Sequence, residues 1–531
     1  MASSSPYLHP ILTSAEAQAW EKAVLGDDPE KAWAAMERAG AGVGAAVLRD
    51  FVQWRPLPRD PKVLVLAGPG HNGGDALLAA QEILRSRPRG RVSVIFLEPV
   101  EKLKPLAKRA WEALAKHAGV EILDEAQLRE ETHAGRWCAW DIALDGLYGM
   151  GFHPPLPEPA RQLIETVNKI SGATGFRAAV DVPSGVSEKP AAAAFTADFT
   201  YATGIAKKPL FDAANAKWVG RIREVDIGFF CGQPGIKYPD ISPEQREFIL
   251  QSSILHWLGR LRDPASDKRA YGRLLVISGS RSYPGAQMLN VLGALRAGAG
   301  LVTALTPESH AAAFAAARPE AMWRACPEEA DGSHGAATLD RARELWPRCT
   351  AVLAGSGLGK GAASQKLILA LAKECTLPLV LDADALTPAV LEAVAQRPQD
   401  FGPVTLTPHA GEFARLAGEG ADLREFCAKH KVITVLKAPI TRISNPHGKF
   451  VWCSTFGGPV LARGGSGDIL AGIIGTLVAQ MPDDATHAAG CGVVWHGLAA
   501  DALARERGDT AALTAELANY LSAALRNDWG H

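Results

Sequence analysis

This sequence lacks the features that mark several broad classes of protein. Its net charge is only −1 over 531 residues, so neither nucleic acid nor an anionic membrane is favoured as an electrostatic partner. No apolar run reaches the roughly 18 residues of a transmembrane helix, and the N-terminal segment has neither the basic leader nor the apolar stretch of a signal peptide. We therefore expect a soluble, cytoplasmic protein that binds neither nucleic acid nor membranes.

Cysteine is also scarce and follows no pattern. The eight cysteines are scattered, and no C-x-x-C pair occurs, which argues against both a zinc site and a disulfide framework. The remaining composition is that of an ordinary globular protein, with 47% hydrophobic and 21% charged residues. The length is enough for two large domains or about three of average size.

The first recognisable unit is a glycine-rich turn between a strand and a helix. An apolar run at 63–66 predicts a buried parallel strand, the glycines of GPGHNGGD (68–75) predict the turn, and the helix is expected from Ala76 onward. Strand, glycine turn and helix in this order form the dinucleotide-binding layout. Asn72 and Asp75 within the turn could reach a ligand or a cation, although Asp75 could equally be a helix N-cap.

Polar residues then recur where predicted strands end. Two of these strands end at Asp145 and Asp181, and Ser184 follows just beyond. In an open parallel sheet, ligands bind outside the carboxyl ends of the strands. Several oxygen ligands without histidine or cysteine suit a hard cation or a polyhydroxylated ligand rather than zinc, although each residue alone could be a turn former. Lys207 follows a later strand, where it could pair with phosphate or a carboxylate.

A glycine- and proline-rich segment at 231–245 predicts a linker, and the second half is expected to open with a helical piece. A second strand–loop–helix unit follows, with a strand at 274–277 and a helix at 287–297. Further on, His409 comes directly after an apolar strand, where it either caps a helix or belongs to a site. Lys437 follows the next strand, ahead of a predicted hairpin.

A second glycine-rich turn stands close to the C-terminal end, in ARGGSGDILAGIIGT (462–476). The run from Gly464 to Gly467 leads into Asp468 and then an apolar, helix-compatible segment. A glycine turn that opens a helix presents free backbone N–H groups, which suit phosphate or an oxyanion. Asp468 would be the acidic group beside that anion, placed to accept a proton from a hydroxyl. The alternative is a tight turn with an N-capping aspartate.

Taken together, these motifs resemble two known families joined in one chain. The first half resembles the YjeF N-terminal family, epimerases of hydrated nicotinamide dinucleotides, at MERAG (36–40), GPGHNGGD (68–75), DGLYGMG (145–151), DVPSG (181–185), Lys207 and VDIG (225–228). The second half resembles the partner dehydratase, at YG (271–272), SGSRSYPGA (278–286), GSGLG (355–359), DADAL (382–386), TPHAGEF (407–413), LKAPIT (436–441) and GGSGD (464–468). The resemblance implies a Rossmann-like three-layer α/β/α epimerase domain at 1–235 and a ribokinase-like α/β dehydratase domain at 236–531.

The implied activity is repair of nicotinamide cofactors. Water adds to the ring of NADH or NADPH and gives hydrates, NADHX and NADPHX, as R and S epimers. The first domain would interconvert the epimers, and the second would remove water from the S form at the expense of ADP or ATP, with Mg²⁺ accompanying the nucleotide. The resemblance favours ADP as the donor and a homo-oligomeric assembly. The alternative is a ribokinase-like small-molecule kinase joined to a non-catalytic N-terminal binding domain.

The resemblance also assigns residues to roles. In the first domain, a potassium ion would be bound by Asn72, Asp145 and Ser184. The hydrate there would be contacted by His71, Asn72, Gly73, Gly74, Asp75, Gly149, Met150, Gly151 and Asp181, and Asp181 would be the acid–base residue with Lys207 as its charge partner. In the second domain, the hydrate would be contacted by Ala286, Gly357, His409 and Asp468, of which Asp468 is the general base. The nucleotide would be bound by Lys437, Ala438, Pro439, Ile440, Thr441, Gly464, Gly465, Ser466 and Gly467.

The sequence departs from the family pattern at six positions. Three lie in the first half, at His71, Ala76 and Thr203. The other three lie in the second half, where none removes a residue that the chemistry requires. They are Asp267, Ser356 and Ala438.

Overall fold

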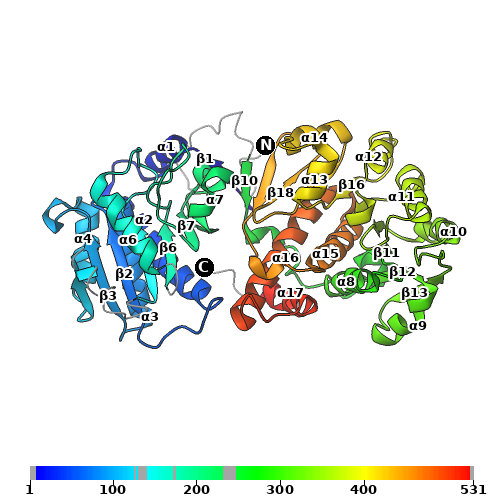
Figure 1. Ribbon diagram of the computed structural model, residues 1–531, viewed down its shortest axis with the longest axis horizontal. Coiled ribbons are helices and arrows are strands. Elements are labelled where there is room, and N and C mark those ends of the chain that lie inside the picture. Colours follow the sequence, from blue (N-terminus) through cyan, green and yellow to red (C-terminus); the bar gives the residue numbers. More distant parts are fainter. Residues whose placement is uncertain (1–6, 125–126, 129–139, 172–174, 231–246, 527–531) are drawn as a thin grey trace. The chain divides into compact units, whose positions relative to one another are not determined.

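The computed structural model describes residues 7–124, 127–128, 140–171, 175–230 and 247–526. It divides into two compact units, His9–Gln245 and Arg246–His531, of which the second also takes in Tyr7 and Leu8 (Figure 1). The predicted linker at 231–245 and the predicted boundary at 235 lie outside the described residues. Each unit is built around its own sheet and its own apolar core.

The sheet of the first unit has seven strands, and every neighbouring pair is parallel. In sheet order the strands are β4 (Val120–Ile122), β3 (Arg91–Phe96), β2 (Lys62–Ala67), β5 (Ile142–Gly146), β6 (Phe176–Val180), β7 (Phe199–Thr203) and β9 (Arg221–Val225). A further parallel pair joins β1 (Leu8–Leu12) to β8 (Ala206–Lys207), with Leu12 opposite Lys207. The continuous apolar runs in the sequence are explained by burial of the strands on both faces.

Helices cover both faces of this sheet. Val63 and Val65 of β2 face a core shared with helices α1 (Ser14–Leu25), α2 (Pro29–Phe51), α3 (His71–Ser86) and α4 (Pro105–Leu114). The alternate residues Leu64 and Leu66 face a second core, which includes side chains of α6 (Glu158–Ser171). Since successive side chains of a strand point to opposite faces, the two cores define three layers. The predicted α/β/α architecture is confirmed.

The second unit has a larger, mixed sheet. In order, its strands are β13 (Met322–Cys326), β12 (Leu301–Pro307), β11 (Arg273–Ile277), β14 (Ala351–Ala354), β15 (Leu379–Leu381), β16 (Val404–Leu406), β17 (Ile433–Leu436), β18 (Thr441–Ser444), β19 (Val451–Ser454) and β10 (Glu247–Leu250). Only β18 runs antiparallel to its neighbours, and it forms the predicted hairpin with β19. The expected helical piece at the start of this half is wrong, because 248–250 is a buried apolar run that pairs with β19 as strand β10.

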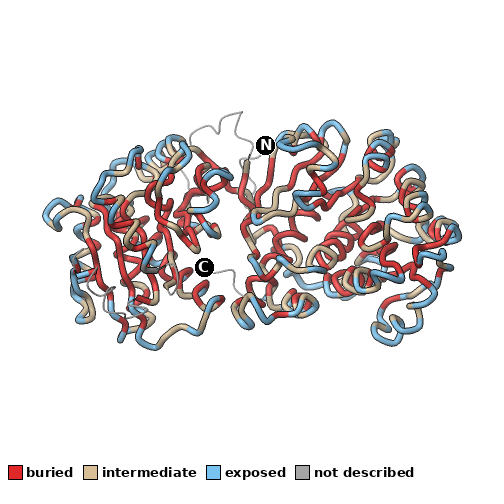
Figure 2. Tube along the Cα trace, viewed as in Figure 1, coloured by how far each residue is buried: buried red, intermediate tan, exposed pale blue. Residues whose placement is uncertain are grey.

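Four helices pack on one face of this sheet and share its core: α8 (Pro284–Arg296), α15 (Ser466–Gln480), α16 (Ala485–Arg507) and α17 (Leu517–Arg526). The unit is completed by α9 (Glu308–Ala317), α10 (Ala337–Leu345), α11 (Ala362–Glu374), α12 (Pro388–Ala395), α13 (Ala410–Ala417) and α14 (Leu423–His430). In Figure 2 the buried segments run through the centre of each unit, along the strands and, in the second unit, along α15 and α16. The predicted α/β class is confirmed for this half as well.

Both glycine-rich motifs enter their helices earlier than we predicted. Helix α3 begins at His71 rather than Ala76, so Gly73 and Gly74 lie inside it. Glycine is required there by close packing: a Cβ on Gly73 would lie 2.0 Å from the carbonyl oxygen of Gly68, and one on Gly74 would lie 2.7 Å from the sulfur of Met36. These glycines therefore allow neighbouring backbone and side chains to pack closely, and they do not form a turn.

The described residues include neither a membrane-spanning helix nor a disulfide bond. No described helix is long and apolar enough to cross a bilayer. The described cysteines are free thiols, at Cys326, Cys349, Cys375, Cys427, Cys453 and Cys491.

Candidate active sites

The first unit contains a pocket of about 530 Å³ at the carboxyl ends of β2, β5 and β6. This is the edge where ligands bind in open parallel sheets. Of the predicted substrate-binding residues, the pocket is lined by His71, Asn72, Asp75, Gly149, Met150, Gly151 and Asp181. Gly73 and Gly74 are buried inside α3 and are not among the described residues that line it.

An ion pair joins Asp181, which lines this pocket, to the buried Lys207. The Lys207 ammonium donates to Oδ1 of Asp181 and, at 3.0 Å, to the carbonyl oxygen of Thr203, whose hydroxyl donates to the same Asp181 oxygen at 3.2 Å. Lys207 is fully buried. Asp181 has a φ of 67°, which a non-glycine residue adopts only when its surroundings impose it. The fold therefore holds a charged carboxylate in a constrained position at the pocket floor.

Two further carboxyl groups line the same pocket. Burial raises the pKa of Glu21 to about 7, an effect that the charge of Lys207 opposes and that of Asp181 reinforces. Burial also raises the pKa of Asp75 well above its usual range, and the charges of Asp181 and Glu21 add to the effect. Burial and the repulsion between neighbouring carboxyl groups therefore both favour the protonated forms of Glu21 and Asp75.

The three predicted potassium ligands converge on the backbone of Tyr148. Asn72 donates to the Tyr148 carbonyl at 2.8 Å, and the Ser184 hydroxyl lies 2.9 Å from the Tyr148 amide. Asp145 accepts the Ser184 hydroxyl at 2.6 Å and the Ser184 amide at 2.7 Å. The Asn72 Oδ1 atom is buried and has no hydrogen-bond partner among the described residues. The side-chain oxygens of Asn72, Asp145 and Ser184 thus lie around one point, and oxygen ligands suit a hard cation.

Burial raises the pKa of Asp145 to about 6, although hydrogen bonds from Ser184 and Leu147 act in the opposite direction. No cluster of three or more His, Cys, Asp or Glu side chains suited to a metal exists in the part of the chain that the structure describes. Asn72, Asp145 and Ser184 contribute no histidine or cysteine ligand, so this set does not suit zinc.

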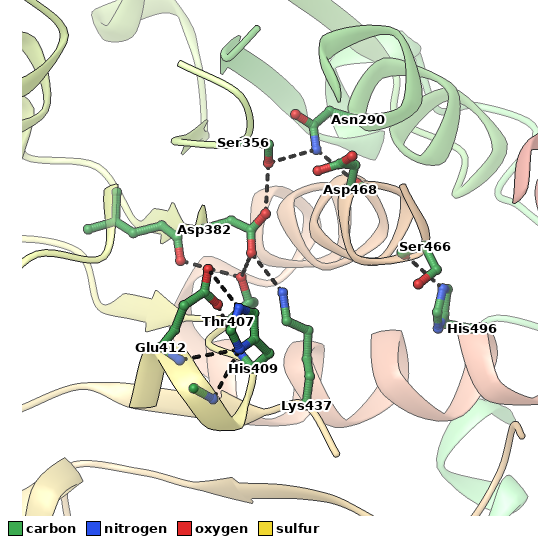
Figure 3. Close-up of polar contacts among 12 residues, drawn as sticks. Asn290, Ser356, Asp382, Thr407, His409, Glu412, Lys437, Ser466, Asp468 and His496 are labelled. Atoms are coloured by element: carbon green, nitrogen blue, oxygen red, sulfur yellow. Dashed lines mark hydrogen bonds and ion pairs between the residues drawn. The ribbon is translucent and has the colours of Figure 1, made fainter. Parts of the chain in front are cut away.

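In the second unit, Asp382 is the hub of the candidate site (Figure 3). Its Oδ1 accepts from the Thr407 hydroxyl at 2.7 Å and from the Lys437 ammonium at 3.0 Å, and its Oδ2 accepts from the Ser356 hydroxyl at 2.8 Å. Asp382 is buried, at 2% exposure. Burial opposes ionisation of Lys437, but the charge of Asp382 and its hydrogen bond outweigh this and raise the Lys437 pKa above its ordinary value. Lys437 is therefore a permanent cation.

Asp468 lies in the first turn of α15, beside this network (Figure 3). Its pKa is raised to about 7, because burial and the charge of Asp382 raise it by more than Lys437 and the Ser356 hydroxyl lower it. Its backbone carbonyl accepts from Asn290, which also donates to Ser356 at 3.2 Å. A pKa near the working pH suits a general base.

The amino end of α15 is open to a ligand. The helix begins at Ser466, and its N-cap is Gly465 with a φ of 90°, so no side chain caps the first turn. The Lys437 ammonium lies beside Gly467, since a Cβ there would be 3.1 Å from it. Uncapped N–H groups with an adjacent ammonium form an anion site. The alternative in which Asp468 caps the helix is wrong, because Asp468 is the third residue of α15.

Arg463 and His496 fix this turn from outside. The guanidinium of Arg463 donates to the carbonyl oxygens of Asp509, Thr510 and Ala512. His496 lies with Nε2 3.1 Å from the carbonyl oxygen of Ser466, and burial lowers its pKa to about 4. The histidine is therefore neutral at physiological pH and serves as an uncharged support.

His409 caps helix α13, which was one of the two interpretations of its place in the sequence. Its Nδ1 accepts from the amides of Gly411 and Glu412, and the Glu412 carboxylate accepts from the His409 amide at 2.8 Å. Its side chain is nevertheless 56% exposed, and its backbone bridges to Lys437. The residue can therefore cap α13 and still contact a ligand.

Ala286 and Gly357 form another edge of this region. Gly357 has a φ of 64°, and a Cβ there would lie 2.8 Å from that of Ala286. Sequence reasoning did not single out Asp382, Asn290 or Glu21 as site residues. The only signal for Asp382 was its place at a strand end within DADAL, and no sequence signal distinguished Glu21 from other charged residues of an amphipathic helix.

Comparisons with known proteins agree with this picture. A family model described as NAD(P)H-hydrate dehydratase matches residues 274–523, and one described as YjeF-related protein N-terminus matches residues 33–209. The chain is 37% identical over 484 residues to the bifunctional NAD(P)H-hydrate repair enzyme Nnr of Gloeobacter violaceus, covering 89% of each chain. It is 34% identical over 508 residues to the protein of the same name from Thermosynechococcus vestitus, covering 93% of each.

A solved structure, ADP/ATP-dependent NAD(P)H-hydrate dehydratase from Bacillus subtilis co-crystallized with ATP/Mg²⁺, is 31% identical, covers 50% of this chain and 92% of its own, and has a TM-score of 0.43. The family resemblance seen in the motifs is confirmed by the full-length relatives. The chain belongs to the family of bifunctional NAD(P)H-hydrate repair enzymes.

Proposed function

We propose that this protein repairs NADHX and NADPHX at two active sites. The first unit interconverts the R and S hydrates, and the second removes water from the S hydrate at the expense of ADP or ATP. The observation that carries the dehydratase assignment is the position of Asp468, a carboxylate of raised pKa in the first turn of an uncapped helix, beside the Lys437–Asp382 pair. A small-molecule kinase would share the fold but not the family membership.

Hydroxide is a poor leaving group, so dehydration requires the ring hydroxyl to be activated. In the proposed step Asp468 accepts the proton of that hydroxyl while its oxygen attacks the terminal phosphoryl group of the nucleotide. The lone pair of the ring nitrogen then expels phosphate and leaves the reduced ring after loss of a ring proton. A positioned general base of this kind contributes roughly 10²–10⁴ in rate.

The nucleotide phosphates are proposed to lie at the amino end of α15. The backbone amides of Gly464, Gly465, Ser466 and Gly467 and the Lys437 ammonium supply the positive electrostatic environment that phosphoryl transfer requires. Residues 438–441, which follow Lys437 into β18, are proposed to contact the rest of the nucleotide. A magnesium ion accompanying the nucleotide would neutralise part of the phosphate charge. Ala286, Gly357 and His409 are proposed to contact the hydrate.

In the first unit, Asp181 is proposed to exchange protons with the hydrate. The Lys207 ammonium donates to Asp181 Oδ1 and so fixes the position of this carboxylate in the pocket. Gly149 separates Asp181 from Asn72, because a Cβ there would lie 3.1 Å from Asp181 Oδ2 and 3.2 Å from Asn72 Cγ. The absence of a side chain at Gly149 thus leaves the hydrate access to both groups.

A potassium ion is proposed at Asn72, Asp145 and Ser184. The buried Oδ1 of Asn72, which has no hydrogen-bond partner among the described residues, and the nearby oxygens of Asp145 and Ser184 fit such an ion. The ion would supply positive charge beside the pocket and favour the ionised form of Asp145. The chain's own residues around Tyr148 hold this corner of the pocket in place.

One assay tests both activities. The protein is incubated with mixed R and S hydrates, with and without ADP or ATP, and recovery of the reduced ring is followed by its absorbance. Recovery of both epimers is expected only with a nucleotide present. Recovery limited to the S share would refute the epimerase assignment, and accumulation of a phosphorylated product would favour a kinase. The expected cytoplasmic location and homo-oligomeric state are tested by fractionation and by light scattering.

A further inference from the structure

Glu21 lines the first-unit pocket but has no part in the steps described so far. Its position is set by β1 and α1, the first strand and helix of the described chain. Strand β1 pairs with β8 so that Leu12 lies opposite Lys207, and α1 begins at Ser14, directly after this strand. The indole of Trp20 donates to the Phe229 carbonyl at 3.4 Å. These two contacts place the neighbouring Glu21 in the pocket wall, on the helix that follows the partner strand of Lys207.

The charges that face Glu21 come from several elements. Asp75 lies on α3, Asp181 follows β6 and Lys207 belongs to β8, while Lys104 also lines the pocket. Lys207 is committed to Asp181 and to the Thr203 carbonyl, so it cannot form a second ion pair of equal strength. Ionisation of Glu21 and Asp75 beside the Asp181 carboxylate would bring like charges together in a poorly hydrated site. The cluster is therefore built to hold one exchangeable proton beside a fixed carboxylate.

We propose that Glu21 is the second acid–base catalyst of the epimerase, acting as proton donor to the hydroxyl of the hydrate while Asp181 acts as proton acceptor. This inference rests on the proposed epimerase function of the first unit. Two carboxyl groups whose surroundings separate their protonation states supply an acid and a base in one pocket. Lys207 is fully buried and donates to Asp181 and to the Thr203 carbonyl, so the pocket needs another group to donate a proton to the hydrate.

The protonation behaviour of the group supports this assignment. Burial raises the pKa of Glu21 to about 7, so the carboxyl exchanges its proton near neutral pH, where a general acid is most effective. Burial and the charges of Asp181 and Glu21 raise the pKa of Asp75 well above its usual range, which favours its protonated form. Glu21 lines the same pocket as Asp181 and stands on the helix that follows the partner strand of Lys207, so its position suits it to proton transfer.

The reaction balances as follows. The carbon–oxygen bond of the hydrate breaks as the ring nitrogen lone pair forms a C=N bond, and the Glu21 proton leaves with the hydroxyl as water. A water molecule then adds to the opposite face of this carbon, the C=N π electrons return to nitrogen, and the water gives up a proton to Asp181. The product is the other epimer, with the proton moved from Glu21 to Asp181. This is the protonation state that the reverse reaction requires, as in other two-base isomerases.

The test uses the full-length chain and the Glu21→Gln variant, which keeps the size of the side chain and removes the exchangeable carboxyl proton. Epimerisation is measured by chromatographic separation of the R and S hydrates. We expect kcat to fall roughly 10²–10⁴-fold with little change in KM. We also expect the wild-type rate to fall above about pH 7, where Glu21 loses its proton, and Glu21→Gln to lack this alkaline limb. Glu21→Asp should recover part of the rate.

Three controls separate the outcomes. Dehydration of pure S hydrate by the same variant reports folding of the chain and should be unchanged. Lys22→Gln removes a charge from the exposed neighbouring position of α1 and should behave as wild type. In ¹⁸O-labelled water, each inversion should introduce solvent oxygen into the hydrate.

Wild-type rate and pH profile in Glu21→Gln would overturn this inference and leave the epimerase intact. Inversion without solvent oxygen would overturn the proposed bond cleavage. Failure of the wild-type chain to epimerise would instead refute the proposed function itself.

Discussion

Dehydration should depend on the ionisation of Asp468. Its charged neighbours should shift the pH at which dehydration begins. The burial of Asp468 and the charge of Asp382 raise its pKa to about 7, and Lys437 lowers it. A general base works only when deprotonated, so activity with saturating nucleotide should rise with pH through this value. Between about pH 6 and pH 8 the ionised fraction grows from roughly one-tenth to nine-tenths, an increase of nearly tenfold.

Substitutions around Asp468 should shift the pH dependence of dehydration in opposite directions. Asp468→Asn should reduce dehydration by roughly 10²–10⁴-fold, equivalent to about 3–5 kcal/mol of transition-state stabilisation. Asp382→Asn removes a neighbouring negative charge, so it should move the acid limb to lower pH. Lys437→Met removes a positive charge, so it should move the limb to higher pH and also raise the KM for the nucleotide.

The assay is steady-state recovery of the reduced ring from pure S hydrate over a range of pH, with circular dichroism to show that each variant is folded. Epimerisation of the R hydrate by the same preparations is the internal control, because the first unit keeps its own site. A flat wild-type profile across this range would refute the role of Asp468. So would a limb that stays in place in both Asp382→Asn and Lys437→Met.

Further predictions concern binding and stability. Gly73→Ala should lower the thermal midpoint, because the added Cβ meets the backbone carbonyl of Gly68 at 2.0 Å, and overpacking costs about 1–3 kcal/mol; an unchanged midpoint would contradict the packing argument. Asn72→Ala should remove any stimulation of epimerisation by potassium over choline, and equal potassium dependence in both proteins would exclude Asn72 as a ligand. The folded-state pKa of His496 is lowered from 6.5 to about 4, so the unfolded chain binds the proton first as pH falls, and stability should decrease between these values by up to about 3 kcal/mol. Urea unfolding of His496→Asn should show a flatter pH dependence; an equal slope would contradict this.

Much of the fold was predictable because it depends on local patterns. Apolar runs such as 63–66 and 274–277 identified the buried strands, and glycine turns identified the entries to α3 and α15. Strand β10 was missed, since a short apolar run reads equally as helix or strand until its partner β19 is known. The helix starts were placed late because the sequence does not show that Gly73 is packed against Gly68.

The candidate sites were predictable to the extent that one motif contained them. Asp468 and Lys437 were found through their own motifs, and the structure brings them together. The hub Asp382 and the wall residue Glu21 were not singled out, because their importance comes from partners far away in the sequence. Asp382 faces Lys437 fifty-five positions later, and Glu21 reaches Asp181 only through the pairing of β1 with β8.

The pairing of β1 with β8 matters for the choice of boundaries when the first domain is expressed on its own. The YjeF-related match begins at residue 33, whereas β1 and α1, which bring Glu21 to the pocket, end at Leu25. A fragment cut at the match boundary would keep Asp181 and Lys207 but lack one wall of the cavity that surrounds them. An isolated first domain designed for expression should therefore include the segment from Leu8, and an inactive shorter fragment would say nothing about the activity of the intact chain.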